Sequence, residues 1–291
     1  MGSRLLYYLV ILPLSSLPFW ILYRISDFMY LILYQVIGYR RKVVQQNLRN
    51  SFPEKSSEEI IKIEKGFYSH LCDLIVESLK AFTISEKQAT KRFTCKNEEM
   101  VDAFYDKGRS IVLVGGHYGN WELYAVTVCQ QIKHRPLALF TPLKNTFFNE
   151  KILRSRSKFG LEMLPIQSIK KRMAEVNKVP TAVIFAADQS PRKSQRAYWM
   201  EFLNQDTGVQ FGTEKFAKDY NLPVIFGNIH KLKRGYYEIR YSLITDNPTG
   251  TAYGEITEAH TRMLEREIQK EPQYWLWSHK RWKHKRPDSN T

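Results

Sequence analysis

The sequence has few cysteines and comparatively few acidic residues. Only Cys72, Cys95 and Cys129 occur among 291 residues, and their spacing matches neither a disulfide framework nor a thiolate metal site. We therefore expect reduced thiols and a domain that faces the cytoplasm. Asp and Glu number 29 against 44 Lys and Arg, which leaves a net charge of +15. This excess favours anionic partners: phosphorylated lipid, an acidic carrier protein or nucleic acid.

Several familiar motifs are absent. The chain has no Gly-x-Ser-x-Gly elbow that would present a serine nucleophile. It has no His-Glu-x-x-His and no carboxylate cluster, so we assign no metal to His117, Glu122 or Asp188. Repeats and low-complexity linkers are also missing, so residues 46–291 are predicted to form one catalytic domain.

The basic tail from Ser278 to Arg286 leaves two interpretations. No helix-turn-helix, zinc finger or aromatic RNA-binding pattern accompanies it, so we do not expect nucleic acid as the partner. A membrane surface accounts for the same composition, with Trp275, Trp277 and Trp282 at the interface and the cations on lipid phosphates.

Residues 1–45 are predicted to anchor the chain to a membrane. Leu5 to Tyr23 carries no charge and is interrupted only by Pro13 and Pro18, a length just sufficient to span a bilayer. A second apolar stretch, Phe28 to Ile37, precedes Arg40-Arg41-Lys42, which places the catalytic domain on the cytoplasmic side. The segment either spans the membrane or lies in its interface, and a helical hairpin packed on the domain is the alternative.

The stretch from Ile111 to Glu122 is the predicted catalytic centre. Branched residues to Val114 indicate a buried strand, and Gly115, Gly116 and Gly119 allow a sharp turn before a short helix capped by Asn120. His117 precedes Glu122 by a His-x4-Glu spacing, so Glu122 is expected to hold one ring nitrogen while the other acts as a base. The alternative is a capping histidine beside a solvated glutamate.

Strand and helix patterns alternate through the rest of the chain. This alternation predicts an α/β fold with a mostly parallel central sheet flanked by helices. Sites in such sheets collect at the carboxyl ends of strands, where His117 and Asp188 both fall. The predicted strands are 111–114, 137–140, 163–166, 181–186, 224–226 and 237–241, and the main predicted helices begin at Ser57, Asn97, Trp121, Asn145, Ile169, Phe211 and Glu255.

The Gly115-to-Glu122 block resembles the His-x4-Asp/Glu block of the glycerolipid and lipid A acyltransferases, most of all the lauroyl/myristoyl acyltransferases of late lipid A biosynthesis. Further matches follow in that family's order and cover nearly the whole chain: Pro142-Leu143-Lys144-Asn145, Arg156 before Gly160, Asp188-Gln189, Glu201-Phe202-Leu203, Thr213, and the ending Glu271-Pro272-Gln273-Tyr274-Trp275-Leu276-Trp277-Ser278-His279-Lys280-Arg281-Trp282-Lys283. Thr141 and Phe202-Leu203-Asn204 depart from the family pattern, and we expect them to bear on substrate choice.

The resemblance implies a glycerolipid acyltransferase-like fold at the bacterial inner membrane and an O-acyltransferase reaction. The donor would be an acyl carrier protein thioester and the acceptor a hydroxyl of an anionic, phosphorylated lipid A precursor, with no cofactor. His117 and Glu122 would be catalytic. Arg156, Asp188, Asn145 and Lys144 would bind substrate or the oxyanion, although each has a simpler interpretation as a solvated basic residue, turn former or helix cap.

Other functions remain open from the sequence. The acceptor could instead be lysophospholipid, glycerol phosphate, a mannosylated phosphoinositide or an aminolipid. A non-catalytic basic protein that binds membrane surfaces would account for the charge, with His117 and Glu122 incidental.

Overall fold

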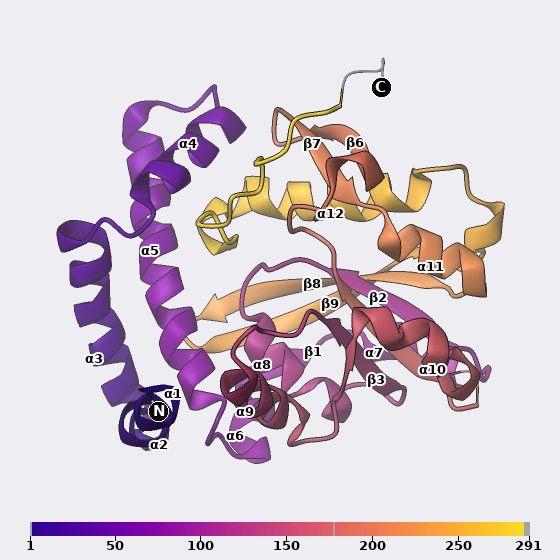
Figure 1. Ribbon diagram of the computed structural model, residues 1–291, viewed down its shortest axis with the longest axis horizontal. Helices are drawn as coiled ribbons and strands as arrows, with labels where there is room; N and C mark the ends of the chain where they lie inside the picture. The colour runs from indigo at the N-terminus through magenta and orange to yellow at the C-terminus, as the bar shows by residue number, and fades with distance from the viewer. Residues whose placement is uncertain (1, 177, 288–291) are drawn as a thin grey trace.

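The computed structural model describes residues 2–176 and 178–287. A twisted sheet lies at its centre, with helices above it, below it and along one end (Figure 1). The order of strands in this sheet is β1-β9-β8-β2-β5-β3-β4. The strands are β1 (Phe93–Cys95), β2 (Ile111–Gly115), β3 (Arg135–Phe140), β4 (Glu162–Pro165), β5 (Thr181–Ala186), β8 (Val224–Lys233) and β9 (Tyr236–Thr245).

The pairing confirms the predicted mostly parallel sheet. Strands β8 and β9 form an antiparallel hairpin, whereas β1 with β9, β8 with β2, β2 with β5, β5 with β3 and β3 with β4 are all parallel. Strand β2 lies in the middle and is buried on both faces, which is why its branched residues form a continuous run rather than an alternating one.

Twelve α-helices are described in residues 2–176 and 178–287. They are α1 (Gly2–Leu6), α2 (Leu12–Ser16), α3 (Phe19–Tyr30), α4 (Arg41–Ser51), α5 (Ser57–Lys80), α6 (Glu86–Arg92), α7 (Glu98–Tyr105), α8 (Trp121–Ala125), α9 (Thr146–Ser157), α10 (Ile169–Val176), α11 (Gly212–Tyr220) and α12 (Glu255–Lys270). The helix predicted from Ile169 to Lys178 thus reaches Val176, and residue 177 lies outside the described residues.

Three strands escaped prediction. Strands β6 (Ala197–Phe202) and β7 (Gln205–Gln210) form a separate hairpin. Its turn places Leu203 and Asn204 in the left-handed region, a conformation that ordinarily favours glycine. Strand β1 is too short to show a period of its own, and its pairing with β9 decides its conformation.

Two hydrophobic clusters fill the two faces of the sheet. Val112 and Val114 of β2 join the first, which α4, α5, α11, α12 and the C-terminal segment cover. Ile111 and Leu113 join the second, beneath α6, α7 and α8. Alternate residues of one strand therefore anchor both layers, as the two-residue period of a strand requires.

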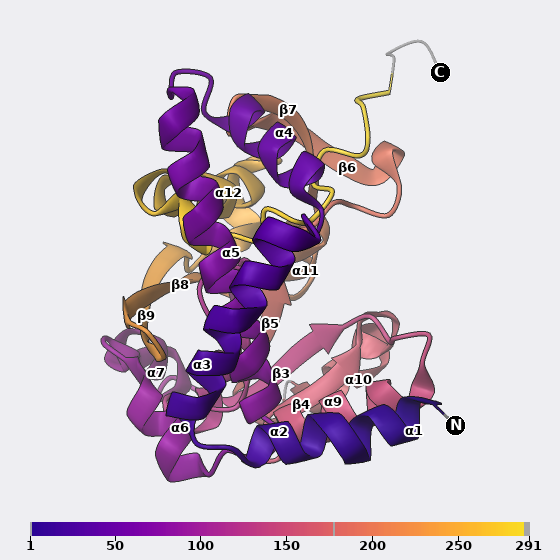
Figure 2. The same cartoon turned by 90° about the vertical axis from the view of Figure 1, so that its left-hand side faces the viewer.

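The N-terminal apolar segment forms a bent helix pair. The axes of Gly2–Ser16 and Phe19–Val36 are bent by 119° relative to each other. The bend falls at Pro18, which has no backbone N–H to continue the first helix. Among the described residues no single helix is both long and apolar enough to cross a bilayer, whereas this pair passes by length and composition together. The first part runs along the lower edge of the molecule and the second rises beside α5 (Figure 2).

A buried glutamate ties this pair to the sheet. Glu77, on α5, is fully buried and accepts hydrogen bonds from Tyr23 of α3 (2.9 Å), Tyr237 of β9 (2.9 Å) and Asn120 of the predicted catalytic turn (2.5 Å). Burial and the nearby charge of Asp73 raise the pKa of Glu77. One carboxyl group therefore joins α3, α5, β9 and the turn.

Replacing Glu77 distinguishes its hydrogen bonds from its charge. Glu77→Gln keeps an acceptor for Asn120 and Tyr237, and its amide can donate to the Tyr23 hydroxyl. Glu77→Ala leaves three buried donors unpaired at about 1–3 kcal/mol each. We expect the alanine variant to unfold about 10 °C below the wild type in a thermal melt and the glutamine variant to stay within a few degrees. Equal losses for both would show that the charge, not the network, matters.

Candidate active site

Strand register brings His117 and Asp188 together. Gly115 at the end of β2 pairs with Ala186 at the end of the parallel strand β5. His117 and Asp188 each follow two residues later, so they leave the same edge of the sheet side by side. The Asp188 Oδ2 atom accepts from the backbone N–H of His117 at 2.8 Å, and its Oδ1 lies 2.7 Å from the His117 Nδ1 atom. Asp188 thus holds His117 both by its backbone N–H and by its imidazole ring.

The glycines of the turn permit this close packing. A Cβ at Gly116 would lie 2.8 Å from the Leu264 side chain. Gly119 has a φ of +64°, and a Cβ there would lie 2.7 Å from Ile229. The Gly119 N–H donates to the Tyr274 carbonyl at 3.0 Å, and its carbonyl accepts from His70 of α5 at 3.2 Å. The turn is therefore held from three sides.

The environment of His117 suits a base. Its side chain is 20% exposed, whereas that of Asp188 is 3% exposed. Burial alone would lower the pKa of His117, but the charge and hydrogen bond of Asp188 outweigh it and raise the pKa. Burial opposes ionisation of Asp188, yet the contacts with His117 and Trp275 lower its pKa to about 2. Neutral His117 therefore carries its proton on Nδ1, toward Asp188, and leaves the Nε2 lone pair available.

The partner of Glu122 differs from the expectation. We expected Glu122 to hold the His117 ring, but its carboxylate instead pairs with Arg156 of α9, at 2.9 Å to Nε and 2.5 Å to Nη2. Asp188 holds the ring because strand register places it there, whereas the helix start carries Glu122 toward α9. The two pairs are neighbours, since Glu122 and Arg156 both affect the pKa of His117. Four side chains of alternating charge thus line the site.

Lys144 and Asn145 lie at the start of α9, away from this group. Asn145 caps the helix by accepting from the Phe148 N–H at 3.1 Å, and its amide donates to Ser3 at 2.8 Å. Lys144 is exposed. The simpler interpretation of Asn145 as a helix cap describes what it contacts here.

An apolar cavity of about 390 Å³ opens beside the two pairs. Trp121, Glu122 and Arg156 line its polar end. Its walls are hydrocarbon side chains from α5, α9, the N-terminal helices and the C-terminal segment: Ile11, Leu71, Leu74, Ile75, Leu79, Phe82, Phe148, Ile152 and Leu276. A deep apolar space that ends at charged groups fits a long aliphatic chain with a polar head.

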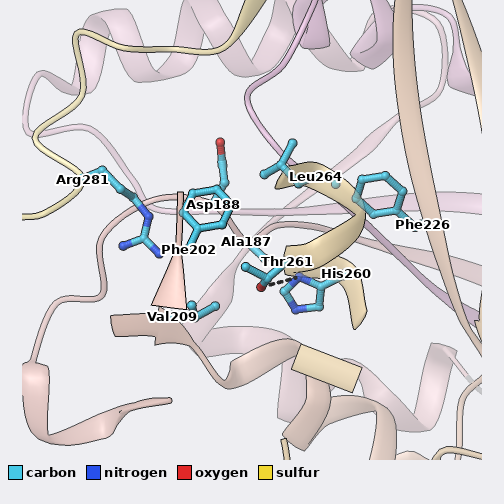
Figure 3. A pocket seen from close by; sticks show the side chains of 10 residues that line it. Ala187, Asp188, Phe202, Val209, Phe226, His260, Thr261, Leu264 and Arg281 are labelled. Atoms are coloured by element: carbon cyan, nitrogen blue, oxygen red, sulfur yellow. Dashed lines mark hydrogen bonds between the residues drawn. The ribbon is translucent and has the colours of Figure 1, made fainter. Parts of the chain in front are cut away.

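Behind Asp188 lies a small enclosed cavity that sequence reasoning did not foresee. Arg281 enters from the C-terminal segment and His260 from α12 (Figure 3). The Arg281 Nη1 donates to the Gly208 carbonyl at 2.8 Å, while burial lowers its pKa to about 10 against the opposing charge of Asp188. Asp188 therefore lies between the ring of His117 and the guanidinium of Arg281.

The C-terminal segment corrects a second expectation. Trp275 and Trp277, predicted at a membrane interface, are 3% and 0% exposed. The Trp275 indole donates to Asp188 Oδ2 at 2.9 Å, and Trp282 donates to Thr207 at 2.7 Å. These tryptophans therefore pack against the site and the β6–β7 hairpin. In the sequence these tryptophans stand out only because the C-terminal pattern of the family contains them, and that pattern does not reveal whether they are buried.

No group of three or more His, Cys, Asp or Glu side chains is arranged to bind a metal ion within the described ranges. The arrangement can instead remove a proton from a bound hydroxyl through His117 Nε2. The nearest hydrogen-bond partner of that atom is the side chain of Gln189, at 3.4 Å.

Asp188→Asn should lower the pKa of His117 and reverse its tautomer. The amide oxygen can still accept from Trp275 and from the His117 N–H, so the amide NH₂ faces Nδ1 and the proton moves to Nε2. Nitrogen-15 NMR of histidine-labelled protein in detergent measures both changes. The matched control Asp246→Asn, at an exposed position, should leave His117 unchanged. An unaltered tautomer in Asp188→Asn would contradict the assigned pairing.

A double-mutant cycle should detect the Glu122–Arg156 pair. Side-chain exposures of 19% and 28% make it partly desolvated, so we expect Glu122→Gln and Arg156→Gln to show a coupling of about 1–3 kcal/mol in the free energy of unfolding. The exposed pair Asp106–Lys133 is the control, where we expect a much smaller coupling because solvent screens both charges. Equal coupling in the two pairs would show that desolvation adds nothing.

Comparison with known proteins identifies the family. The model of the bacterial lipid A biosynthesis acyltransferases matches residues 2–284. The lipid A biosynthesis palmitoleoyltransferase of Escherichia coli K12 is 21% identical over 248 residues, which cover 84% of this chain and 79% of that protein. A lipid A biosynthesis acyltransferase of Shigella flexneri matches to the same extent. The family model spans the N-terminal apolar segment, the His-x4-Glu turn and the C-terminal segment alike, and the chain therefore belongs to the bacterial lipid A biosynthesis acyltransferase family.

Proposed function

We propose that the protein transfers a fatty acyl group from an acyl carrier protein thioester to a hydroxyl of a phosphorylated lipid A precursor. The observation that carries the proposal is the juxtaposition of the His117–Asp188 pair with an apolar cavity that ends at Glu122 and Arg156. A base for a hydroxyl and a compartment for a hydrocarbon chain are the two parts that acyl transfer to a lipid requires.

The reaction follows from the geometry of His117. Its Nε2 takes the proton of the acceptor hydroxyl as the oxygen attacks the thioester carbonyl. The resulting imidazolium is stabilised by Asp188, which is 2.7 Å from Nδ1. The tetrahedral intermediate collapses, the C–S bond breaks, and the leaving thiolate recovers the proton from His117. No cofactor is required, because the thioester is already activated.

Arg156 and the turn are the candidates for stabilising the oxyanion. Arg156 lines the polar end of the cavity, where the thioester carbonyl would lie. Glu122 holds its guanidinium through two hydrogen bonds, so Glu122 would act as a positioning residue for Arg156 rather than as the partner of the base. Lys144, Asn145 and the net positive charge would serve the anionic lipid and the acidic carrier protein.

The N-terminal bent pair is the proposed membrane anchor at the cytoplasmic face of the bacterial inner membrane. Large apolar side chains on its surface are exposed, among them Leu9 (69%), Trp20 (70%) and Val36 (79%). Exposed apolar groups at this density favour burial in a bilayer interface. Such an anchor would keep the cavity beside the lipids it uses, with residues 46–291 as the catalytic domain.

The proposal predicts a product and its loss in a variant. Purified full-length protein, incubated with acyl carrier protein thioesters and a tetra-acylated lipid A precursor, should add one acyl group, which mass spectrometry detects. His117→Ala should reduce the rate by about 100- to 10,000-fold, the usual contribution of a general base.

His230→Ala, on the β8 strand, is the matched control and should retain wild-type turnover. Absence of a product with every acyl chain length would overturn the lipid A acceptor, and other lipid acceptors would then be tested. Equal turnover by wild type and His117→Ala would overturn the assignment of the base.

A further inference from the structure

A second groove, of about 530 Å³, lies beside the first cavity along the same face of α5. Met29 and Leu33 form one wall, from the second arm of the bent pair. Leu71 and Ile75 of α5 form the floor, and Leu276 and His279 of the C-terminal segment form the opposite wall. Tyr39, Arg40 and Ser278 complete the lining, so the groove is apolar along the helices and polar at the end near His279, which suits an aliphatic chain that carries a polar group.

The groove shares a wall with the apolar cavity already described. Leu71, Ile75 and Leu276 line both spaces. These side chains form a ridge, with one compartment facing Ile152 and the other facing Leu33. The enzyme therefore has two neighbouring hydrocarbon compartments, separated by single side chains.

The polar end of the second groove is tied to the segment that follows Asp188. The His279 Nε2 atom accepts from the Ser190 N–H at 3.2 Å, two residues beyond Asp188. Arg40 fixes the same segment by donating to the Ser278 carbonyl at 2.9 Å. The charges of Asp188 and His117 both influence the pKa of His279, which burial lowers. The first cavity ends at Glu122 and Arg156, and the second ends at His279, with His117 near both.

Acyl transfer joins two lipids at one atom, so two hydrocarbon chains must approach His117 together. The donor carbonyl belongs near Arg156, which leaves the first cavity to the donor chain. We propose that the second groove binds an acyl chain already present on the acceptor lipid and so presents the acceptor hydroxyl to His117. This inference rests on the proposed function and adds where the acceptor binds.

The surroundings of the groove supply a route from the bilayer. Phe28 and Leu31, on the same helical arm as Met29 and Leu33, are 62% and 46% exposed. A chain leaving the membrane along this apolar arm enters the groove without crossing water, where exposure of its methylenes is unfavourable.

Photo-crosslinking tests occupancy without turnover. The probe is a tetra-acylated lipid A precursor that carries a diazirine in one of its acyl chains, added to full-length His117→Ala protein. We expect labelled peptides containing Met29 and Leu33. An acyl thioester with the same diazirine should label the peptide containing Ile152. Labelling of the Ile152 peptide by the acceptor probe, or failure to label Met29 and Leu33, would overturn the assignment.

Filling the groove tests its role in catalysis. Leu33→Trp occupies space that a chain would use and should raise the KM for the acceptor by about tenfold, equivalent to two methylenes left unburied. Its donor chain-length preference should not change. Leu243→Trp, at an exposed position on β9 that lines neither compartment, is the matched control. Ile152→Trp should instead change donor chain-length preference.

The two failures are distinguishable. If the wild type forms no product, the proposed function fails. If it forms product and Leu33→Trp leaves the acceptor KM unchanged, the acceptor groove alone is wrong. An effect of Leu33→Trp on donor preference would reassign the groove to the donor chain.

Discussion

The carboxylate of Asp188 is the interaction on which the candidate site depends. It accepts from the backbone and faces the ring of His117, and it also accepts from Trp275. Three segments distant in sequence thus meet at one buried group: the end of β2, the end of β5 and the C-terminal segment. Such a group is costly to bury unless all its lone pairs are used. The orientation of the His117 ring and the docking of the C-terminal segment therefore depend on the same carboxylate.

Helix α5 makes a similar connection to the N-terminal helices. Glu77 binds Tyr23, Asn120 and Tyr237, and His70, two turns earlier on the same helical face, binds the Gly119 carbonyl. A displacement of the N-terminal pair would therefore disturb the turn that carries His117. This coupling explains why the N-terminal helix pair packs so closely on the sheet. The two apolar compartments lie side by side along α5, next to this pair.

Charge in the site alternates rather than accumulates. Asp188 faces His117, and Glu122 faces Arg156. Arg281 adds a buried cation behind Asp188. The carboxylates of Asp188 and Glu122 each have a basic side chain in contact, so neither is a buried charge without a partner. Burial and the charge of Arg156 lower the pKa of His117, whereas Asp188 and Glu122 raise it, and the carboxylates outweigh the other two.

The sequence by itself determined the strands other than β1, β6 and β7, the mostly parallel sheet, the glycine turn and the position of His117, because periodicity, capping and turn residues act over short distances. It also located Asp188 at a strand end. Only tertiary structure decided that Asp188, not Glu122, holds the ring, because strand register joins residues far apart in sequence. The burial of Trp275 and Trp277 likewise could not be predicted from the sequence, because a basic aromatic segment has the same composition whether it lies on a membrane or packs against a protein core.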